Sequence, residues 1–292
     1  TCPSDNYHYT ALFTVGSESK LVLNNVSAET DERVVKASGC GEVIVSGGTY
    51  NITGINAFLG AAFETKTASF TDMKLTAKYG GCVQVGSNAT LENCEIKVTD
   101  IRTGDGTYLN CAVAVQYGGT ATVKSGTYTA PYAAYVYNSG GTINIENGTF
   151  TGVVRADATT DTTAVINIKN GSFNGEIQKG GGPGSETISI TGGTFNGTVN
   201  NTGTITGGVF NNTVSGSGTI KGGTFNAPMT GSGTESDPYQ IGTAEQLKLF
   251  RDIVNGSNGQ TPNRGRQSET IPKKIRFTTR AHLTAAATPF PA

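Results

Sequence analysis

The sequence contains no tryptophan, few charged residues and only two histidines. Charged side chains make up 15% of the 292 residues, compared with about a quarter in an average soluble domain. The net charge of −1 gives no electrostatic basis for binding nucleic acid or an anionic membrane surface. Because His8 and His282 lie near opposite ends and no Cys-x-x-Cys motif occurs, we expect no metal site and no cofactor.

Long apolar runs are also missing. No segment approaches the roughly 20 consecutive apolar residues that cross a bilayer as a helix, so the sequence predicts no membrane span. It shows no signal peptide and does not begin with methionine, and we expect that a targeting segment has been removed. Proline numbers only nine, which argues against a disordered proline- and glycine-rich tract.

The five cysteines all lie within the first 111 residues, and their odd number does not suit a fully paired disulfide framework. Cys82 and Cys111 open the similar segments CVQV and CAVAV, so they occupy similar places in successive copies of a repeat. Two interpretations stay open for this pair. They form a disulfide, or they are buried thiols that behave as small apolar side chains.

Glycine is abundant, at 41 residues, which is about twice its usual share. Glycine and asparagine favour tight turns, whereas isolated β-branched and aromatic residues favour strands. The composition therefore predicts many short strands joined by tight turns.

A short motif recurs along the chain: an apolar residue, a polar residue, a turn containing Asn or Gly, Thr or Ser, and an aromatic residue. It is clearest in INIENGTFTG (143–152), INIKNGSFNG (166–175) and ISITGGTFNG (188–197). Alignment of all copies gives a column of anchor residues: Ala28, Tyr50, Leu75, Ile96, Tyr128, Phe150, Phe173, Phe195, Phe210 and Phe225. A second apolar column lies five residues earlier: Leu23, Val45, Phe70, Leu91, Val123, Ile145, Ile168, Ile190, Ile205 and Ile220. A third lies four residues after the later anchors: Tyr132, Val154, Ile177, Val199, Val214 and Met229.

One copy has too few apolar residues to form a core, but stacked copies make a continuous one. The sequence therefore predicts an all-β fold, a single-stranded parallel β-helix (β-solenoid) of about ten rungs. The variable segments between the third column of one copy and the first column of the next are expected to emerge as loops on one face. The longest of them is 99–119.

The turn before each anchor suits a backbone with positive φ, which glycine adopts without a Cβ penalty. The residues just before the later anchors form a predicted ladder of hydroxyl groups: Thr149, Ser172, Thr194 and Thr224. Because this ladder adjoins the buried anchors, we expect no long exposed Thr-x-Thr array of the kind that binds ice.

These GG-T-F-rich rungs resemble the right-handed parallel β-helix of the pectate-lyase-like superfamily over about residues 10–230. The left-handed alternative needs a strict six-residue period, which the spacing of Ile205, Phe210, Val214 and Ile220 does not follow. The resemblance implies the fold and leaves the activity open.

The C-terminal part is different. We expect the β-helix to occupy 1–230, with a linker and a helix in 231–259 that begins at Thr243 and ends at Gly256. This helix either caps the stack or opens a further module, since GTESDPYQIGTAEQL resembles a lead-in found in secreted bacterial surface proteins. The basic tail 260–292 fits neither pattern, and we interpret it as an interruption of the native module rather than as a nucleic-acid-binding tail.

Candidate functional residues are sparse. Tyr117, Tyr135 and Tyr137 are predicted to bind sugar rings as aromatic platforms, although Tyr137 aligns with Val115 when the Gly-Gly-Thr turns are matched and then belongs to the core. Two charged clusters, Asp100–Arg102–Asp105 and Arg155–Asp157–Asp161, are the places where the base and the carboxylates of a lyase would be sought. We interpret both clusters as solvated loop charges and predict no catalytic residue.

The leading hypothesis is a non-catalytic, extended domain of a secreted or cell-surface bacterial protein, an adhesin that binds surface glycans or a matrix polysaccharide. One alternative is a polysaccharide lyase or glycoside hydrolase of the superfamily, with a groove lined by charged residues. Another is the solenoid of a phage tail or fibre, which would form a trimer.

Overall fold

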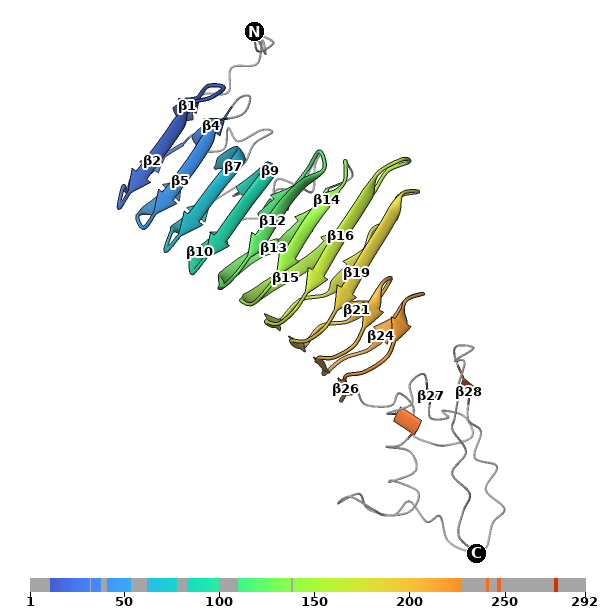
Figure 1. The fold of residues 1–292 in the computed structure, drawn as a ribbon. Coiled ribbons are helices and arrows are strands. Elements are labelled where there is room, and N and C mark those ends of the chain that lie inside the picture. The colour runs from blue at the N-terminus through green and yellow to red at the C-terminus, as the bar shows by residue number, and fades with distance from the viewer. Residues whose placement is uncertain are drawn as a thin grey trace, which may run out of the picture. The chain divides into compact units, whose positions relative to one another are not determined.

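The computed structural model describes residues 11–31, 33–37, 41–53, 62–77, 83–99, 110–137, 139–226, 240–241, 246–247 and 276–277. In this part of the chain almost all secondary structure is β, and the predicted parallel β-solenoid is confirmed (Figure 1). The chain divides into two compact units, Thr1–Thr224 and Phe225–Ala292.

Three stacks of parallel strands form the solenoid, and the first carries the column that precedes the anchors. Figure 1 shows its strands side by side along the coil axis. They are β2 Lys20–Asn24, β5 Glu42–Ser46, the second halves of β7 Phe63–Thr71 and β9 Val83–Glu92, β12 Gly119–Val123, β14 Gly141–Ile145, β16 Thr163–Ile168, β19 Ser185–Ile190, β22 Thr204–Ile205 and β25 Thr219–Ile220. The register pairs Leu23 with Val45 and continues to Ile205 with Ile220, which confirms the predicted column.

The second stack carries the anchor column. Its strands are β3 Ala28–Thr30, β6 Thr49–Ile52, β8 Lys74–Ala77, β10 Cys94–Val98, the first halves of β13 Gly126–Val136 and β15 Thr149–Ala156, β17 Ser172–Phe173, β20 Thr194–Phe195, β23 Val209–Phe210 and β26 Thr224–Phe225. Parallel pairing from Ala28 through Tyr50 to Phe195 and Phe210 confirms the anchors as one column. Consecutive rings from Phe150 to Phe210 lie nearly parallel, with centroids 4.8 to 5.1 Å apart.

The third stack extends further toward the N-terminus than the sequence alignment indicated. Its strands are β1 Ala11–Val15, β4 Arg33–Ala37, the first halves of β7 and β9, β11 Cys111–Val115, the second halves of β13 and β15, β18 Ile177–Lys179, β21 Val199–Asn200 and β24 Val214–Ser215. Val154, Ile177, Val199 and Val214 share one column as predicted.

Tyr132 was wrongly placed in this third column. Ala134 aligns with Val154, whereas Tyr132 aligns with Val153, because the register of β13 against β15 shifts on both sides of Tyr132. Pro131 lies at this irregularity, where a residue without an N–H is tolerated. Met229, the last predicted member, lies outside the described residues.

The long variable segments also lie in a different place from the one predicted for the early coils. There they separate the second stack from the third, as between Ile52 and Phe63 or between Val98 and Cys111. Strand β11 thus lies within the segment 99–119 that was predicted to be a loop. In later coils the variable segment follows the third stack, between Ala156 and Thr163 for example, as predicted.

Of the second unit the structure describes a parallel pair, β27 Gln240–Ile241 with β28 Arg276–Phe277, and helical backbone at Gln246 and Leu247. The remainder of the predicted helix lies outside the described residues. Among those that are described, no helix has the length and apolar character needed to span a membrane.

Candidate functional site

Five side chains gather on the outward side of the third stack, and we call them the tyrosine–arginine cluster: Tyr132, Tyr135, Tyr137, Arg155 and Asp157. Successive residues of a strand point to opposite sides. Ala134 and Val136 are fully buried and align with Val154 and Ala156 of the core. Tyr135, which lies between them, therefore points away from the core.

The three rings of the cluster support one another. The Tyr132 and Tyr135 rings are stacked, with centroids 5.2 Å apart, and Tyr137 meets Tyr135 edge-on at 5.6 Å. Only 2% of Tyr135 is exposed, whereas Tyr132 and Tyr137 are half-buried and pack against it. Tyr135 is thus a support, and the two outer rings are the surfaces that a ligand can reach.

A hydrogen-bonded ion pair fixes the polar edge of the cluster. The Tyr135 hydroxyl donates to Asp157 Oδ2. Arg155 donates from Nε to the same oxygen at 2.9 Å and from Nη2 to Oδ1 at 3.2 Å. Burial alone would lower the pKa of Arg155, but the Asp157 carboxylate outweighs this effect and raises that pKa above its ordinary value.

The next coil leaves room for this carboxylate and brings a second paired charge nearby. A Cβ at Gly180 would lie 1.3 Å from Asp157 Oδ1, so only glycine fits beside the aspartate. Lys179 Nζ lies 3.1 Å from Glu186 Oε2, and the Ala158 N–H donates to the other oxygen of that carboxylate. Arg155 and Lys179 are thus each matched by a carboxylate.

The alignment of Tyr137 with Val115, which was predicted from the matching Gly-Gly-Thr turns, was wrong. Val136 pairs with Val115, so Tyr137 is one position beyond, on the outward side. The Gly-Gly-Thr turns do match, since Gly119 pairs with Gly141, but the later coil has one extra residue between strand and turn. A slip of one residue moves a side chain to the other face of a strand.

The sequence did not indicate that the tyrosines and the Arg155–Asp157 pair belong together. The signal was present, because Tyr135 and Asp157 are separated by 22 residues, one coil of the repeat. Asp161 lies away from them in an exposed turn with φ of 66°. Tyr117 is 78% exposed in the turn after β11. The cluster Asp100–Arg102–Asp105 and Cys82 lie outside the described residues.

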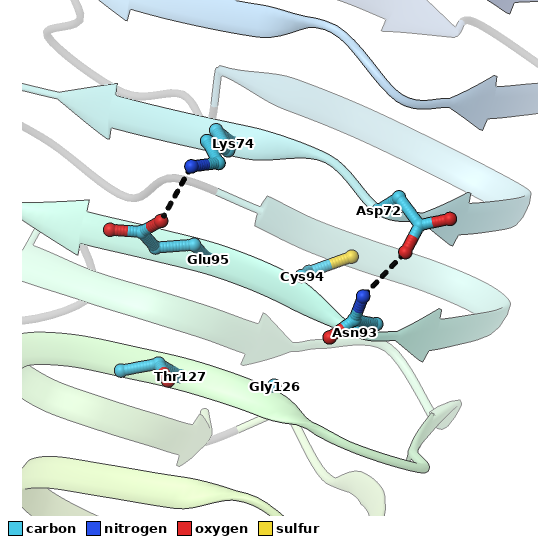
Figure 2. A pocket seen from close by; sticks show the side chains of 7 residues that line it. All are labelled: Asp72, Lys74, Asn93, Cys94, Glu95, Gly126 and Thr127. Carbon is cyan, nitrogen blue, oxygen red and sulfur yellow. Dashed lines mark hydrogen bonds and ion pairs between the residues drawn. The ribbon is translucent and has the colours of Figure 1, made fainter.

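A polar hollow on the second stack is a further candidate (Figure 2). It has a volume of about 370 Å³ and is lined by Asp72, Lys74, Asn93, Cys94, Glu95, Gly126 and Thr127. Figure 2 shows Lys74 directed at Glu95, with 3.5 Å between their charged atoms, and Asn93 directed at Asp72. Its lining has no aromatic side chain and its polar groups bind one another. It therefore suits a sugar less well than the tyrosine–arginine cluster.

No group of three or more His, Cys, Asp and Glu side chains within the described ranges is placed to hold a metal ion. Cys94 is a buried thiol whose Sγ lies 3.4 Å from the Phe70 carbonyl oxygen. Cys111 is buried beside Tyr135.

Comparisons with models of known protein families, with curated proteins and with solved structures found no match. The parallel β-solenoid and the tyrosine–arginine cluster on its surface are therefore the observations from which a function is inferred.

Proposed function

We propose that this chain is a non-catalytic β-solenoid domain of a secreted or cell-surface bacterial protein, and that it binds glycans at the tyrosine–arginine cluster. The observation that carries the proposal is the pair of half-buried rings, Tyr132 and Tyr137, held on either side of the buried Tyr135. Tyrosine presents an apolar face and a polar tip, which suits a ligand with both C–H and O–H surfaces.

Rigidity of the cluster supports binding. Tyr135 is fixed by its hydrogen bond to Asp157, and Asp157 is fixed in turn by two hydrogen bonds from Arg155. Side chains already held in place lose little conformational entropy when a ligand arrives. Tyrosine and arginine are also enriched among the residues that dominate binding energies at interfaces.

The same contacts argue against the lyase alternative at this place. A base formed by Arg155 would have to lose its proton, and the Asp157 carboxylate raises the pKa of that guanidinium instead. Both oxygens of Asp157 already accept hydrogen bonds from Arg155. This cluster is therefore better suited to holding a ligand than to abstracting a proton.

The test is a screen of the full chain against immobilised soluble glycans, followed by calorimetric titration of the strongest binder. Tyr137→Ala should weaken the affinity about tenfold or more, because one of the two reachable rings is removed. Thr151→Ala, an exposed position in β15, is the matched control and should bind like the parent.

Two outcomes would contradict the proposal. One is unchanged affinity in Tyr137→Ala with a normal unfolding midpoint, which would place the ligand elsewhere. The other is release of unsaturated sugars from a polyuronate by the parent, followed by ultraviolet absorbance and abolished in Asp157→Asn, which would make the cluster catalytic.

A further inference from the structure

The outward face of the first stack is a regular array of uncharged polar groups, which was not expected from the sequence. Six strands of the first stack, β7, β9, β12, β14, β16 and β19, each present two outward side chains. These lie on either side of an inward residue that is at most 6% exposed. We call these positions the polar array: Thr67 and Ser69, Asn88 and Thr90, Thr120 and Thr122, Thr142 and Asn144, Val165 and Asn167, and Thr187 and Ser189. All of them except Val165 carry a hydroxyl or amide group.

The array is regular because the pairing beneath it is continuous. Thr120 aligns with Thr142 and Thr122 with Asn144, and the same register runs on to Thr187 and Ser189. Adjacent strands are about 4.8 Å apart, so the two columns extend over about 24 Å from β7 to β19. Alternate residues along a strand place the columns about 7 Å from each other. Only β12 carries threonine at both outward positions, so this array is not a long Thr-x-Thr array of the kind that binds ice.

Two ion pairs border the array at the next outward position of four of its strands. Lys124 Nζ lies 3.0 Å from Glu92 Oε2, and Lys169 Nζ lies 3.0 Å from Glu146 Oε1. Within the array Asn167 donates from Nδ2 to Asn144 Oδ1 at 2.9 Å. An array without charged side chains offers little attraction to an anionic polymer, whether a polyuronate or a nucleic acid. The uncharged array therefore suits an uncharged partner.

We propose that the polar array binds the surface of an ordered, neutral polysaccharide, in which parallel sugar chains present rows of hydroxyl groups. This inference rests on the proposed glycan-binding function and adds a second, separate site to it. Each hydroxyl or amide contributes only modestly once water is displaced, so a short free oligosaccharide that covers a few positions binds weakly. A rigid polymer surface engages many positions together, and their contributions combine.

The experiment is partition of the full chain onto insoluble microcrystalline cellulose and chitin, with the fraction bound measured after sedimentation. The parent should bind at least one polymer, and raising the salt concentration should leave binding unchanged because no ion pair with the polymer is involved. The double variant Thr122→Arg/Asn144→Arg should lose about tenfold or more in partition, since two bulky charges interrupt the array. Thr129→Arg/Thr151→Arg, the same change at two aligned outward positions of the second stack, should bind like the parent.

A milder pair keeps the test valid if arginine disturbs folding. Thr120→Val/Thr142→Val removes two aligned hydroxyl groups without adding volume, and the next coil already carries Val165 in this column. We expect this pair to lower partition about threefold with an unchanged unfolding midpoint.

The failure of this inference can be told apart from failure of the proposed function. Binding to soluble glycans without partition onto either polymer overturns the array proposal alone. Absence of both overturns both. Inhibition of ice recrystallisation by the parent, lost in the arginine pair and unaccompanied by partition, would assign the array to ordered water and also overturn it.

Discussion

At the residue scale, the stability of this protein comes from identical side chains stacked on one another. The Phe195 ring lies 4.8 Å from Phe173 and from Phe210, with interplanar angles of 5° and 7°. All three side chains are at most 1% exposed. Each such ring contributes roughly 1.5–3 kcal/mol by leaving water. The coil spacing dictates the ring spacing, so ring stacking and strand pairing reinforce each other.

Cys94 provides a prediction about pH. Burial raises the pKa of its thiol from 9.0 to about 11. The folded chain therefore keeps this proton at pH values where the unfolded chain has lost it. The resulting stabilisation is complete below pH 9.0 and is lost as the pH rises toward about 11. At about 1.4 kcal/mol per pKa unit, the loss is roughly 2–3 kcal/mol.

The measurement is urea unfolding of the parent and of Cys94→Ala between these two pH values. The pKa values of Tyr128 and Tyr50 are also raised by burial, so both proteins should lose stability in alkali. The difference between the two free energies of unfolding isolates Cys94. It should shrink as the pH rises, and a constant difference would contradict the burial argument.

At the scale of single elements, several bends between strands need a backbone with positive φ, and at some of them a side chain would also overlap the neighbouring coil. In β15 the chain passes from the second stack to the third at Gly152, where φ is 121°. A Cβ there would lie 1.7 Å from the Ala130 carbonyl oxygen of the preceding coil. In the turn after β11, Gly118 has φ of 71°, but a Cβ at this position would meet no other group within 4 Å.

These two glycines allow a matched comparison. Gly118→Ala should cost about 1–2 kcal/mol, the price of left-handed backbone alone. Gly152→Ala should cost clearly more than about 3 kcal/mol, because backbone strain and overlap with the neighbouring coil add together. Equal midpoints of thermal unfolding for the two variants would show that the coils separate easily to admit the methyl group.

At the scale of the whole first unit, the described strands of each coil pair with those of the coils before and after it. Stability in such an arrangement is close to a sum of coil energies and nearest-neighbour terms. The end coils are less well covered than the central ones. Ile220, in the last strand of the first stack, is 46% exposed, whereas Ile168 in the same column is 1% exposed.

We therefore expect the C-terminal coils to open before the central coils. In hydrogen exchange followed by mass spectrometry, amides of β25 should exchange about tenfold or more faster than amides of β16. Their local hydrogen bonding is similar, since Lys221 and Lys169 each donate to the preceding coil at 2.8 Å. Equal protection in both strands would indicate that the stack unfolds as one cooperative unit.

Much of the fold could be predicted from the residues at inward positions of the sequence repeat. The columns through Ile168 and Phe173 were predictable because burial requires the same residue type at the same place in every coil. The tyrosine–arginine cluster and the polar array were not, because they lie on the outward side. There the repeat places no demand on residue type, and the partners of a side chain depend on the length of the coil between them.

The sequence by itself thus determined the solenoid, its inward columns and the glycine-containing turns, since each follows from burial or backbone sterics within a single repeat. Tertiary structure alone decided which outward residues meet. Val136, and not Tyr137, aligns with Val115, and one extra residue then precedes the turn at Gly141. Tyr135 reaches Asp157 because β13 pairs with β15 in a register that places Tyr135 beside Arg155. A strand changes face with every residue, so a shift of one position separates a core side chain from a binding surface.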